Sequence, residues 1–445
     1  MSSGYASGHG RKPEIERWQS LVHVCRRWRC LVFGSPRRLD LKLYCTPKTP
    51  AKDTLDVWPA FPLIIQGMAL SLSNIITALG QSNRVHQVAL HLAGWQLENV
   101  LAAMQVPFPE LTELRFWSYD KTLPVIPDSF MGGSAPRLRF LTLNSIPFPG
   151  LPKLLLSSAT HLVKLQLYDI PHSGYISPQA IVALLSVVSS LELLHLQFRS
   201  PQSRPDWESP RSLHPPKRFI LPALAKFRFK GVTEYLEELM TRIDTPQLGR
   251  IDITFFNQID FDCPRLAQFI TCTPKLRAPD KALVQFNDGT ASVTLGFRAS
   301  KFRPNYLVIC ISCREPDWQL SSIEQVCNSS LPLLSTVEDL YIDHRYLELV
   351  WKNEAIENTL WMEFLLPFTT VKNLYISREF APGIAAALRE LVGGRMTEVL
   401  PGLQNIFVEG LELLGSFQEN IGQFVATRQF SDHPIAISKW FRTRG

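Results

Sequence analysis

A short aliphatic pattern recurs along this chain of 445 residues and restricts the folds that are open to it. The pattern is Leu-x-x-Leu-x-Leu, in which other aliphatic residues or Phe can replace the three leucines. Copies of this template begin at Val85, Leu111, Leu138, Leu162, Leu191, Leu224, Leu248, Val337, Val371 and Leu403. Such repetition predicts a stack of similar structural units, because one unit of this size cannot bury its own apolar face.

Each copy of the template predicts a strand followed by a helix. Positions four and six are apolar and alternate with other residues, as in a strand that buries one face. Helical patterns follow within residues 97–105, 178–190, 233–243 and 384–394. We therefore expect an α/β fold: a leucine-rich-repeat solenoid, an irregular curved stack of parallel strands with helices on its outer face. Residues 38–45 and 61–67 are expected to form earlier, irregular strands of the same stack.

The template lacks one residue that regular leucine-rich repeats carry. An Asn or Cys normally stands three residues after the last template leucine, where its side chain bonds the turn backbone. The corresponding residues here are Ala93, Tyr119, Ile146, Ile170 and Arg199. We therefore expect uneven curvature.

Two segments interrupt the repeats. Residues 199–222 contain six prolines and predict an extended surface loop. Residues 276–336 lack the template and show short alternating strands on either side of Asn287-Asp288-Gly289, a hairpin signal. This irregular block is expected to continue the sheet with antiparallel strands.

The distribution of charge argues against a nucleic-acid partner. The formal net charge is +6, but residues 1–50 alone hold ten Lys or Arg against three Asp or Glu, so the repeats are close to neutral. A protein that binds nucleic acid along its repeats would carry the basic residues there. Neither a run of 18 apolar residues nor a signal-peptide pattern is present. We expect an intracellular protein, cytoplasmic or nuclear, that has reduced thiols and no membrane partner.

Residues 18–33 predict an amphipathic helix. Its apolar arc, roughly 180° wide at 100° per residue, includes Trp18, Leu21, Val24, Cys25, Trp28 and Leu31. An arc of that width indicates contact with two partners, one on each flank. The alternative is a cap helix that is wholly buried against the first repeat, and periodicity does not decide between them.

The segment 18–43 resembles the second half of an F-box, in which a Leu-x-x-Val-Cys-x-x-Trp-x-x-Leu helix precedes a repeat domain. The matching residues are Leu21, Val24, Cys25, Trp28 and Leu31. With residues 43–65, 317–327 and 367–377, nearly the whole chain is similar to the F-box and leucine-rich-repeat proteins abundant in mushroom-forming (basidiomycete) fungi. The resemblance implies that the helix docks on the Skp-type adaptor of an SCF-type cullin–RING ubiquitin ligase and that the repeats recognise a protein substrate.

The chain departs from the F-box pattern before residue 18. The Leu-Pro-x-Glu-Leu/Ile opening and the first F-box helix have no counterpart in the polar residues 1–17. We therefore expect weak or absent adaptor binding, and the alternative function is a repeat scaffold without a ligase role. The expected organisation is a flexible basic tail (1–17), a truncated F-box-like helix with the first strand (18–45) and an irregular repeat domain (46–445).

Catalytic and metal-binding motifs are missing from the sequence. It contains no Gly-x-Gly-x-x-Gly, Walker, His-Glu-x-x-His or Gly-x-Ser-x-Gly stretch. Cys310 and Cys313 form the one Cys-x-x-Cys pair, but residues three apart in a strand point to opposite faces and cannot hold one ion. We expect no enzymatic activity, no cofactor and no metal.

The concave face of the stack is the expected partner-binding surface, because solenoids bind partners along it. Template positions three, five and seven should project there. In the first seven copies these include Glu113, Arg115, Trp117, Lys164, Tyr168, His195, Lys226, Arg228, Lys230, Arg250 and Asp252, six basic and two acidic residues. In the last three copies they include Asp339, Tyr341, Asp343, Tyr375, Phe407 and Glu409, with three acidic residues.

Charge of opposite sign at the two ends suits protein recognition. Lys226, Arg228 and Lys230 should share one face of their strand, where they would bind an acidic partner segment. The alternative is that these positions are ordinary solvated strand residues.

Overall fold

The computed structural model describes residues 24–34, 43–45, 51–55, 61–67, 71–120, 123–147, 161–201, 218–257, 261–297, 305–313, 316–344, 358–391, 398–410, 415–429 and 434–441. Its contacts divide the chain into two compact units, Met1–Ile176 (unit 1) and Ser177–Gly445 (unit 2). The predicted basic tail, Trp18, Leu21 and residues 202–217 of the proline-rich loop lie outside the described residues.

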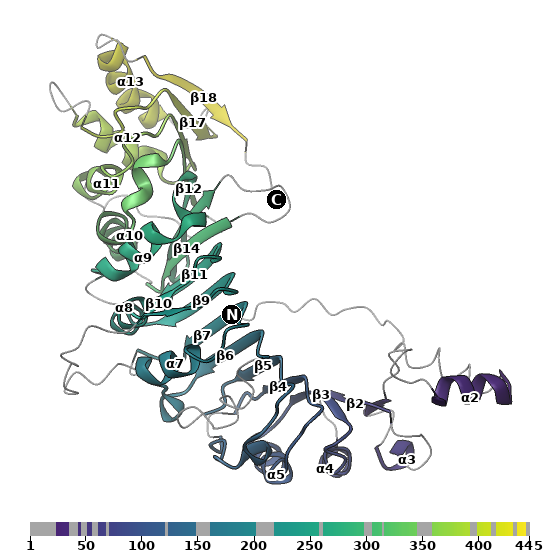
Figure 1. The fold of residues 1–445 in the computed structure, drawn as a ribbon. Coiled ribbons are helices and arrows are strands. Elements are labelled where there is room, and N and C mark those ends of the chain that lie inside the picture. The colour runs from purple at the N-terminus through teal and green to yellow at the C-terminus, as the bar shows by residue number, and fades with distance from the viewer. Residues whose placement is uncertain are drawn as a thin grey trace, which may run out of the picture. The chain divides into compact units, whose positions relative to one another are not determined.

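Unit 1 is a parallel sheet with helices between its strands (Figure 1). Consecutive strands pair in parallel in the order β1 (Leu43–Cys45), β2 (Leu63–Gly67), β3 (Val85–His91), β4 (Glu113–Trp117), β5 (Phe140–Asn144) and β6 (Lys164–Ile170). The helical segments are α2 (Arg26–Gly34), α3 (Ala51–Leu55), α4 (Leu72–Leu79), α5 (Gly94–Ala103), η1 (Phe130–Gly133) and η2 (His172–Gly174). The two early strands predicted upstream of the template correspond to β1 and β2.

Unit 2 has a larger sheet, whose strand order departs from the sequence order in its middle. The strands follow one another as β7 (Leu193–Phe198), β9 (Lys226–Gly231), β11 (Arg250–Phe255), β14 (Asn305–Ile311), β13 (Thr290–Phe297), β12 (Pro279–Asn287), β15 (Asp339–His344), β16 (Asn373–Ile376), β17 (Asn405–Glu409) and β18 (Ala436–Trp440). A second, two-stranded sheet pairs β8 (Phe219–Ile220) with β10 (Ile243–Asp244).

Helices accompany the strands of unit 2 on one side of its sheet (Figure 1). They are α7 (Pro178–Leu185), α8 (Thr233–Met240), α9 (Pro264–Cys272), α10 (Pro316–Ser330), α11 (Asn358–Leu365), α12 (Ala381–Arg389) and α13 (Gly415–Gln429), with short turns η3 (Pro274–Leu276) and η4 (Pro332–Thr336). The α/β class with parallel strands followed by helices is therefore confirmed in both units.

The template explains where the core lies. All three fixed positions in each of the ten copies are at most 2% exposed. Equivalent positions of neighbouring copies also lie opposite one another: Leu340 pairs with Leu374, and Leu374 with Ile406. The apolar side chains thus form continuous rows between the sheet and the helices, because successive side chains of a strand point to opposite faces.

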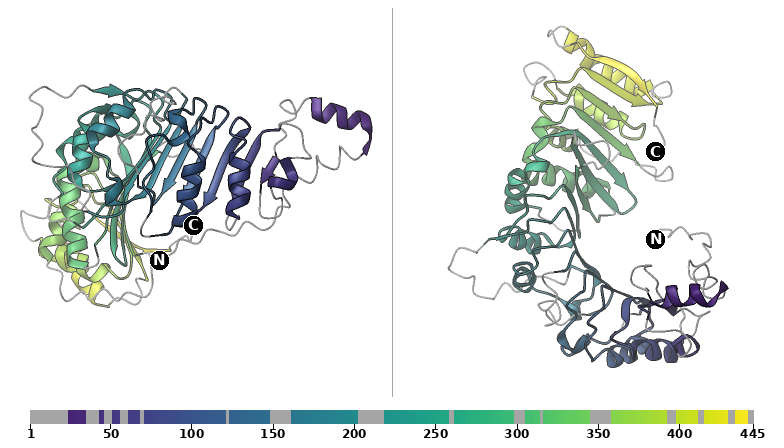
Figure 2. Two further views of the ribbon diagram at one scale, coloured as in Figure 1. Left: turned by 90° about the horizontal axis from the view of Figure 1, so that it is seen from below. Right: turned by 45° about the vertical axis from the view of Figure 1, so that its right-hand side comes forward.

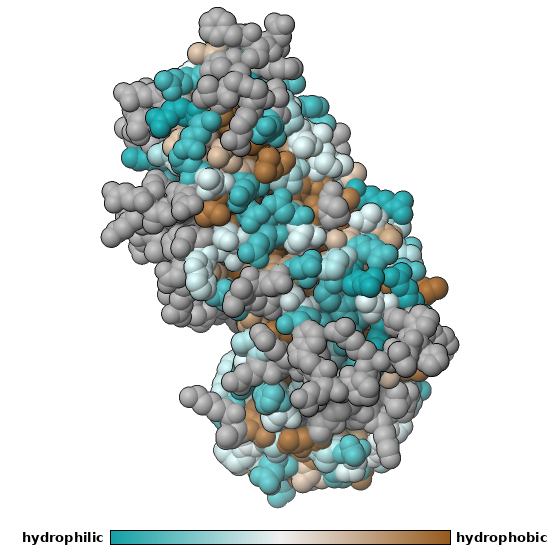
Figure 3. All heavy atoms as spheres, turned by 90° about the vertical axis from the view of Figure 1, so that its left-hand side faces the viewer, coloured by the Kyte–Doolittle hydropathy of each residue, from teal (hydrophilic) through white to brown (hydrophobic). Residues whose placement is uncertain are grey.

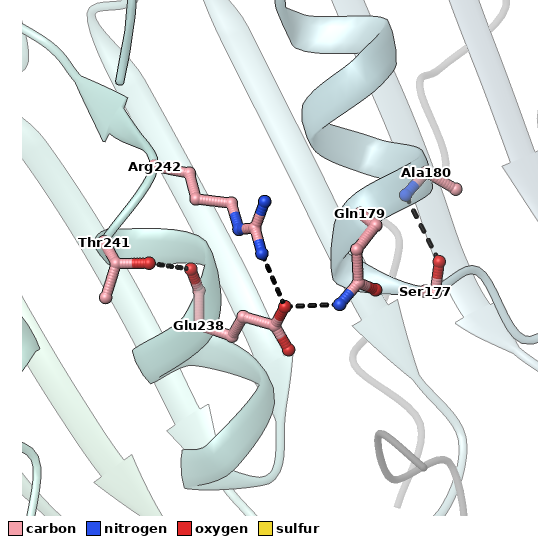
Figure 4. A network of polar contacts seen from close by, with 6 residues as sticks. All are labelled: Ser177, Gln179, Ala180, Glu238, Thr241 and Arg242. Carbon is pink, nitrogen blue, oxygen red and sulfur yellow. Dashed lines mark hydrogen bonds and ion pairs between the residues drawn. The ribbon is translucent and has the colours of Figure 1, made fainter. Parts of the chain in front are cut away.

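The helices are held to one another by polar contacts as well as by their apolar faces. Helix α7 begins at Pro178, and the Ser177 hydroxyl accepts a hydrogen bond from the Ala180 N–H, 3.2 Å away. Glu238 of α8 accepts hydrogen bonds from the side chains of Gln179 and Arg242, as Figure 4 shows. This carboxylate links the start of α7 to α8 at the surface, where such contacts each contribute about 1 kcal/mol or less.

The irregular block forms the hairpin that its sequence predicts. Strands β12 and β13 are antiparallel, and Asn287 pairs with Thr290 across a turn in which Gly289 has φ +76°. Strand β13 is also antiparallel to β14, whereas β14 is parallel to β11 and β12 is parallel to β15. The prediction of antiparallel additions that continue the sheet is confirmed: three strands stand between β11 and β15.

Candidate interaction surface

The sheet of unit 2 has one face that the helices do not cover, which we call the polar face. In β9 the residues alternate between half-buried Lys226, Arg228 and Lys230 and buried Phe227 and Phe229. The strand registers extend this alternation over the neighbouring strands. On these strands the polar face includes Leu193, His195, Gln197, Lys226, Arg228, Lys230, Arg250, Asp252, Thr254, Tyr306, Val308, Cys310, Gly296, Thr294, Ser292, Lys281, Leu283, Gln285, Asp339, Tyr341, Asp343, Asn373, Tyr375, Asn405, Phe407, Glu409, Ala436, Ser438 and Trp440.

Four cations gather on β9 and β11, and we call Lys226, Arg228, Lys230 and Arg250 the basic cluster. Arg250 lies directly opposite Lys226 in the register. Arg228 forms an ion pair with Asp252, with Nε 3.2 Å from Oδ2. The pKa of Lys226 is lowered by burial and by the nearby charges of Arg228 and Arg250. Asp252 is one carboxylate against four cations, so the basic cluster remains cationic.

Aromatic rings and a histidine border the basic cluster. The Lys230 ammonium lies 5.5 Å from the centre of the Phe256 ring, and the Arg250 guanidinium lies 5.8 Å from that of Tyr306. His195 is 7% exposed. Burial, together with the charges of Arg228 and Lys226, lowers its pKa to about 3. The imidazole is therefore neutral near pH 7 and adds no charge to the cluster.

The inserted strands β14, β13 and β12 supply the middle of the polar face. Among their side chains on this face, the charged one is Lys281, whose Nζ lies 3.8 Å from a carboxylate oxygen of Asp339. Cys310 is half-buried on this face, whereas Cys313 is buried. Burial raises the pKa of the Cys310 thiol to about 11, with Asp252 contributing in the same direction. In the described structure, the sulfurs of Cys310 and Cys313 are not joined in a disulfide.

Aromatic rings stack across β15, β16 and β17. The ring centres of Tyr341 and Tyr375 are 4.2 Å apart, and those of Tyr375 and Phe407 are 4.6 Å apart. Trp440 from β18 is inclined against the stack, with its ring centre 6.1 Å from that of Tyr341 and 5.8 Å from that of Tyr375. Burial, and then the adjacent Tyr375, raise the pKa of Tyr341 above its usual value.

Carboxylates surround this aromatic stack. Asp339 and Glu409 are half-buried on the polar face, and Asp343 is 6% exposed. We call the combined set the acidic–aromatic cluster; it consists of Asp339, Tyr341, Asp343, Tyr375, Phe407, Glu409 and Trp440.

An amide ladder runs beside the acidic–aromatic cluster. Asn373 Nδ2 donates to Asp339 Oδ1 over 2.8 Å, and Asn405 Nδ2 donates to Asn373 Oδ1 over 2.8 Å. All three residues occupy template position three, so the signal for this ladder was present in the sequence. The regular Asn or Cys after the template is missing from this chain, and a polar residue recurs instead at position three inside the template. Trp440 was also missed, because β18 lacks the template.

The predicted residues of unit 1 lie on its own sheet. Arg115 forms an ion pair with Glu113. The Lys164 ammonium lies 5.1 Å from the centre of the Phe140 ring. Trp117 stacks on His91, with the ring centres 4.7 Å apart, and the Tyr168 hydroxyl accepts a hydrogen bond from Gln166 over 2.6 Å. Arg115 and Lys164 lie on β4 and β6, which are separated by β5, whereas the four cations of the basic cluster share the paired strands β9 and β11. The unit 1 residues are therefore weaker candidates.

The described part of the F-box-like motif is exposed: Val24 and Cys25 precede α2, and Trp28 and Leu31 lie on it. Val24, Trp28 and Leu31 are 65%, 47% and 57% exposed, and Cys25 is exposed as well. Phe33 approaches Phe61, with ring centres 5.9 Å apart. Figure 2 shows α2 at the N-terminal end of unit 1. The alternative of a cap helix wholly buried against the first repeat is therefore wrong for these side chains.

Metal sites and membrane-spanning helices are the two other features considered, for the part of the chain that the structure describes. There, His, Cys, Asp and Glu side chains do not come together in groups of three or more that could hold a metal ion. Within the same residues, every helix is too short or too polar to cross a membrane. On the helix side, which faces the viewer in Figure 3, hydrophilic and hydrophobic residues are interspersed.

No protein-family model matches the chain. The curated proteins also contain no match. Among solved structures, the chain is similar to the leucine-rich repeat-containing protein LegL7 from Legionella pneumophila, with 10% sequence identity and a TM-score of 0.28. The match covers 86% of this chain and 97% of that chain.

Proposed function

We propose that this chain is a leucine-rich-repeat solenoid that binds a partner protein through the polar face of unit 2. The observation that carries this proposal is the presence of the basic cluster and the acidic–aromatic cluster on one uncovered face. Aromatic residues and Arg are enriched at protein interfaces. Carboxylates beside the aromatic stack would repel a phosphate backbone, so a protein partner fits this face better than a nucleic acid does.

A partner that binds the basic cluster must carry an acidic segment. Like charges at neighbouring positions of a sheet destabilise it. The pKa of Lys226 is lowered first by burial and then by the like charges of Arg228 and Arg250. Carboxylates of a partner would relieve the repulsion on binding. Steering by opposite charges would also speed association, most strongly at low salt.

Reversing charge within the basic cluster tests the proposal. Lys226→Glu with Arg228→Glu should slow association with the native partner and reduce its recovery in proximity labelling from the source cells. Both side chains are half-buried, and Arg228→Glu also removes the ion pair with Asp252, so we expect a loss of stability on the order of 1 kcal/mol. Circular dichroism of the variant checks that the fold is retained. Lys275→Glu with Arg277→Glu is the matched control: both residues are exposed, lie off the polar face and change the net charge equally. Equal recovery by the two double variants would refute a binding role for this cluster.

We further propose that the bound protein is a substrate of an SCF-type ubiquitin ligase and that α2 is the link to the Skp-type adaptor. Trp28 and Leu31 are three residues apart on α2, which places them on one side of that helix, and Val24 lies just before its start. Exposed apolar side chains at this spacing are suited to a groove on another protein. Such a role would place the protein in the cytoplasm or nucleus.

A repeat scaffold without a ligase role is the alternative. The test is co-purification of the chain with a Skp-type adaptor, with and without a complete F-box start grafted before residue 18. We expect weak or no binding by the chain itself and gain of binding by the graft. Replacing Trp28 and Leu31 by Asp should then abolish the gained binding. A graft that does not bind would favour the scaffold.

A further inference from the structure

The basic cluster and the acidic–aromatic cluster lie on the same face of one compact unit, so the sheet fixes the distance between them. Strand β9 carries three of the cations, and β15 carries Asp339 and Asp343. Five strand-to-strand steps separate β9 from β15 in the order β9, β11, β14, β13, β12, β15. At about 4.8 Å for each step, the two strands are ~24 Å apart. An extended chain rises about 3.3 Å for each residue and covers this span with about seven residues.

The middle of this span is nearly neutral. Strands β14, β13 and β12 place Val308, Thr294 and Leu283 opposite one another in a row. All three side chains are half-buried. The same row continues through Leu283 to Tyr341 and the aromatic stack. A partner segment that follows this row would place apolar side chains on it without leaving a charge unpaired.

The two ends of the polar face carry an excess of opposite charges among the described residues. At the basic end, Asp252 is one carboxylate beside four cations. At the other end, Lys281 is one cation beside Asp339, with Asp343 and Glu409 on the same face. Each end therefore attracts charge of the opposite sign, and the half-buried rings around it strengthen that attraction by excluding water.

We propose that the polar face of unit 2 binds a bipolar protein segment, in which carboxylates and Lys or Arg side chains stand about seven residues apart, separated by neutral and apolar residues. The carboxylates contact the basic cluster, and the cations contact the acidic–aromatic cluster. The inserted hairpin strands set the spacing between the two charged ends. This inference rests on the proposed binding function and specifies the chemistry of the partner.

Synthetic peptides test the spacing directly. A fluorescein-labelled series joins an Asp/Glu triplet to a Lys/Arg triplet through neutral spacers of one, four, seven and ten residues, in both orders along the chain. Binding to the purified full-length protein is measured by fluorescence anisotropy at low and at physiological salt. In at least one order, the seven-residue spacer should bind at least ten-fold more tightly than the one-residue spacer and than a peptide with either triplet neutralised. Affinity that is independent of spacer, or equal for one-sided and bipolar peptides, overturns the proposal.

Variants assign each peptide end to its cluster. Lys226→Glu with Arg228→Glu should weaken the seven-residue peptide at least ten-fold, and a peptide with its acidic triplet changed to Lys/Arg should recover binding to this variant. Asp339→Asn with Glu409→Gln should weaken the original peptide while retaining the hydrogen-bond acceptors of the amide ladder. The control Lys275→Glu with Arg277→Glu should leave affinity unchanged. If the peptides fail but the polar-face variants still lose the native partner in cells, the binding function stands and the bipolar inference falls.

Discussion

His195 shows how the environment of a single residue changes its chemistry. Burial beside Arg228 and Lys226 lowers its pKa to about 3, whereas an unfolded chain has a histidine pKa near 6.5. Between these values the unfolded state binds a proton that the folded state does not. The free energy of unfolding therefore falls as the pH drops from about 6.5 towards 3.

We expect His195→Gln to remove this part of the pH dependence. From pH 7 to 5.5 the wild type should lose about 1 kcal/mol more than the variant, given about 1.4 kcal/mol for each pKa unit. Urea unfolding at the two pH values measures the difference. Equal pH dependence of the wild type and His195→Gln would show that His195 binds a proton in the folded state over the same pH range as in the unfolded state.

The template predicts which face of the sheet some residues occupy, but it does not predict their contacts with other strands. Tyr341, Tyr375 and Phe407 stand at template position five, and their alternation with buried residues sufficed to put them on one face. Their stacking and the contact with Trp440 depend on the pairing of strands far apart in sequence. Ion pairs such as Arg228–Asp252 also depend on register, which a single strand does not reveal.

At the scale of elements, the hairpin between β12 and β13 was predictable from its turn residues. A two-residue loop of Asp288 and Gly289 connects paired strands, and Gly289 adopts φ +76°, a region that favours glycine. The order of the inserted strands was not predictable, because alternation identifies strands without naming their neighbours. The result matters for function: this insertion separates the basic cluster from the acidic–aromatic cluster.

Two glycines of this hairpin should respond differently to the same change. Gly289→Ala should lower the free energy of unfolding by about 1 kcal/mol or more, because alanine is strained at positive φ. Gly296→Ala should be tolerated, since its added Cβ would meet Lys281 Cβ at 3.8 Å, an ordinary contact. Chemical denaturation of both variants gives the comparison. Equal stability of the two would mean that the turn does not require the positive φ of Gly289.

Helix α2 was predictable as a helix, while its exposure was not. The periodicity of residues 18–33 fits a buried cap and a docking helix equally well, because both need a wide apolar arc. The exposure of Val24, Trp28 and Leu31 distinguishes the two for the described residues. Only the contacts of a helix, and not its own pattern, decide which apolar side chains face solvent.

At the scale of the whole molecule, the division at Ile176 and Ser177 has no counterpart in the template. Strands β6 and β7 on either side both carry it, so a repeat pattern alone predicts one continuous domain over residues 46–445. The division depends on how many contacts cross each point of the chain. Composition and periodicity do not contain that information.

The central claim is that the polar face of unit 2, and not its helix side, contacts the partner. Site-specific photo-crosslinking tests it most directly, with p-benzoylphenylalanine placed at Tyr375 on the polar face or at Trp318 on α10, which is 56% exposed. Both positions carry an aromatic ring, so the change in size is similar. In cells that contain the native partner, we predict a crosslinked product from position 375 and none from position 318. Crosslinking from position 318 with none from position 375 would contradict the account.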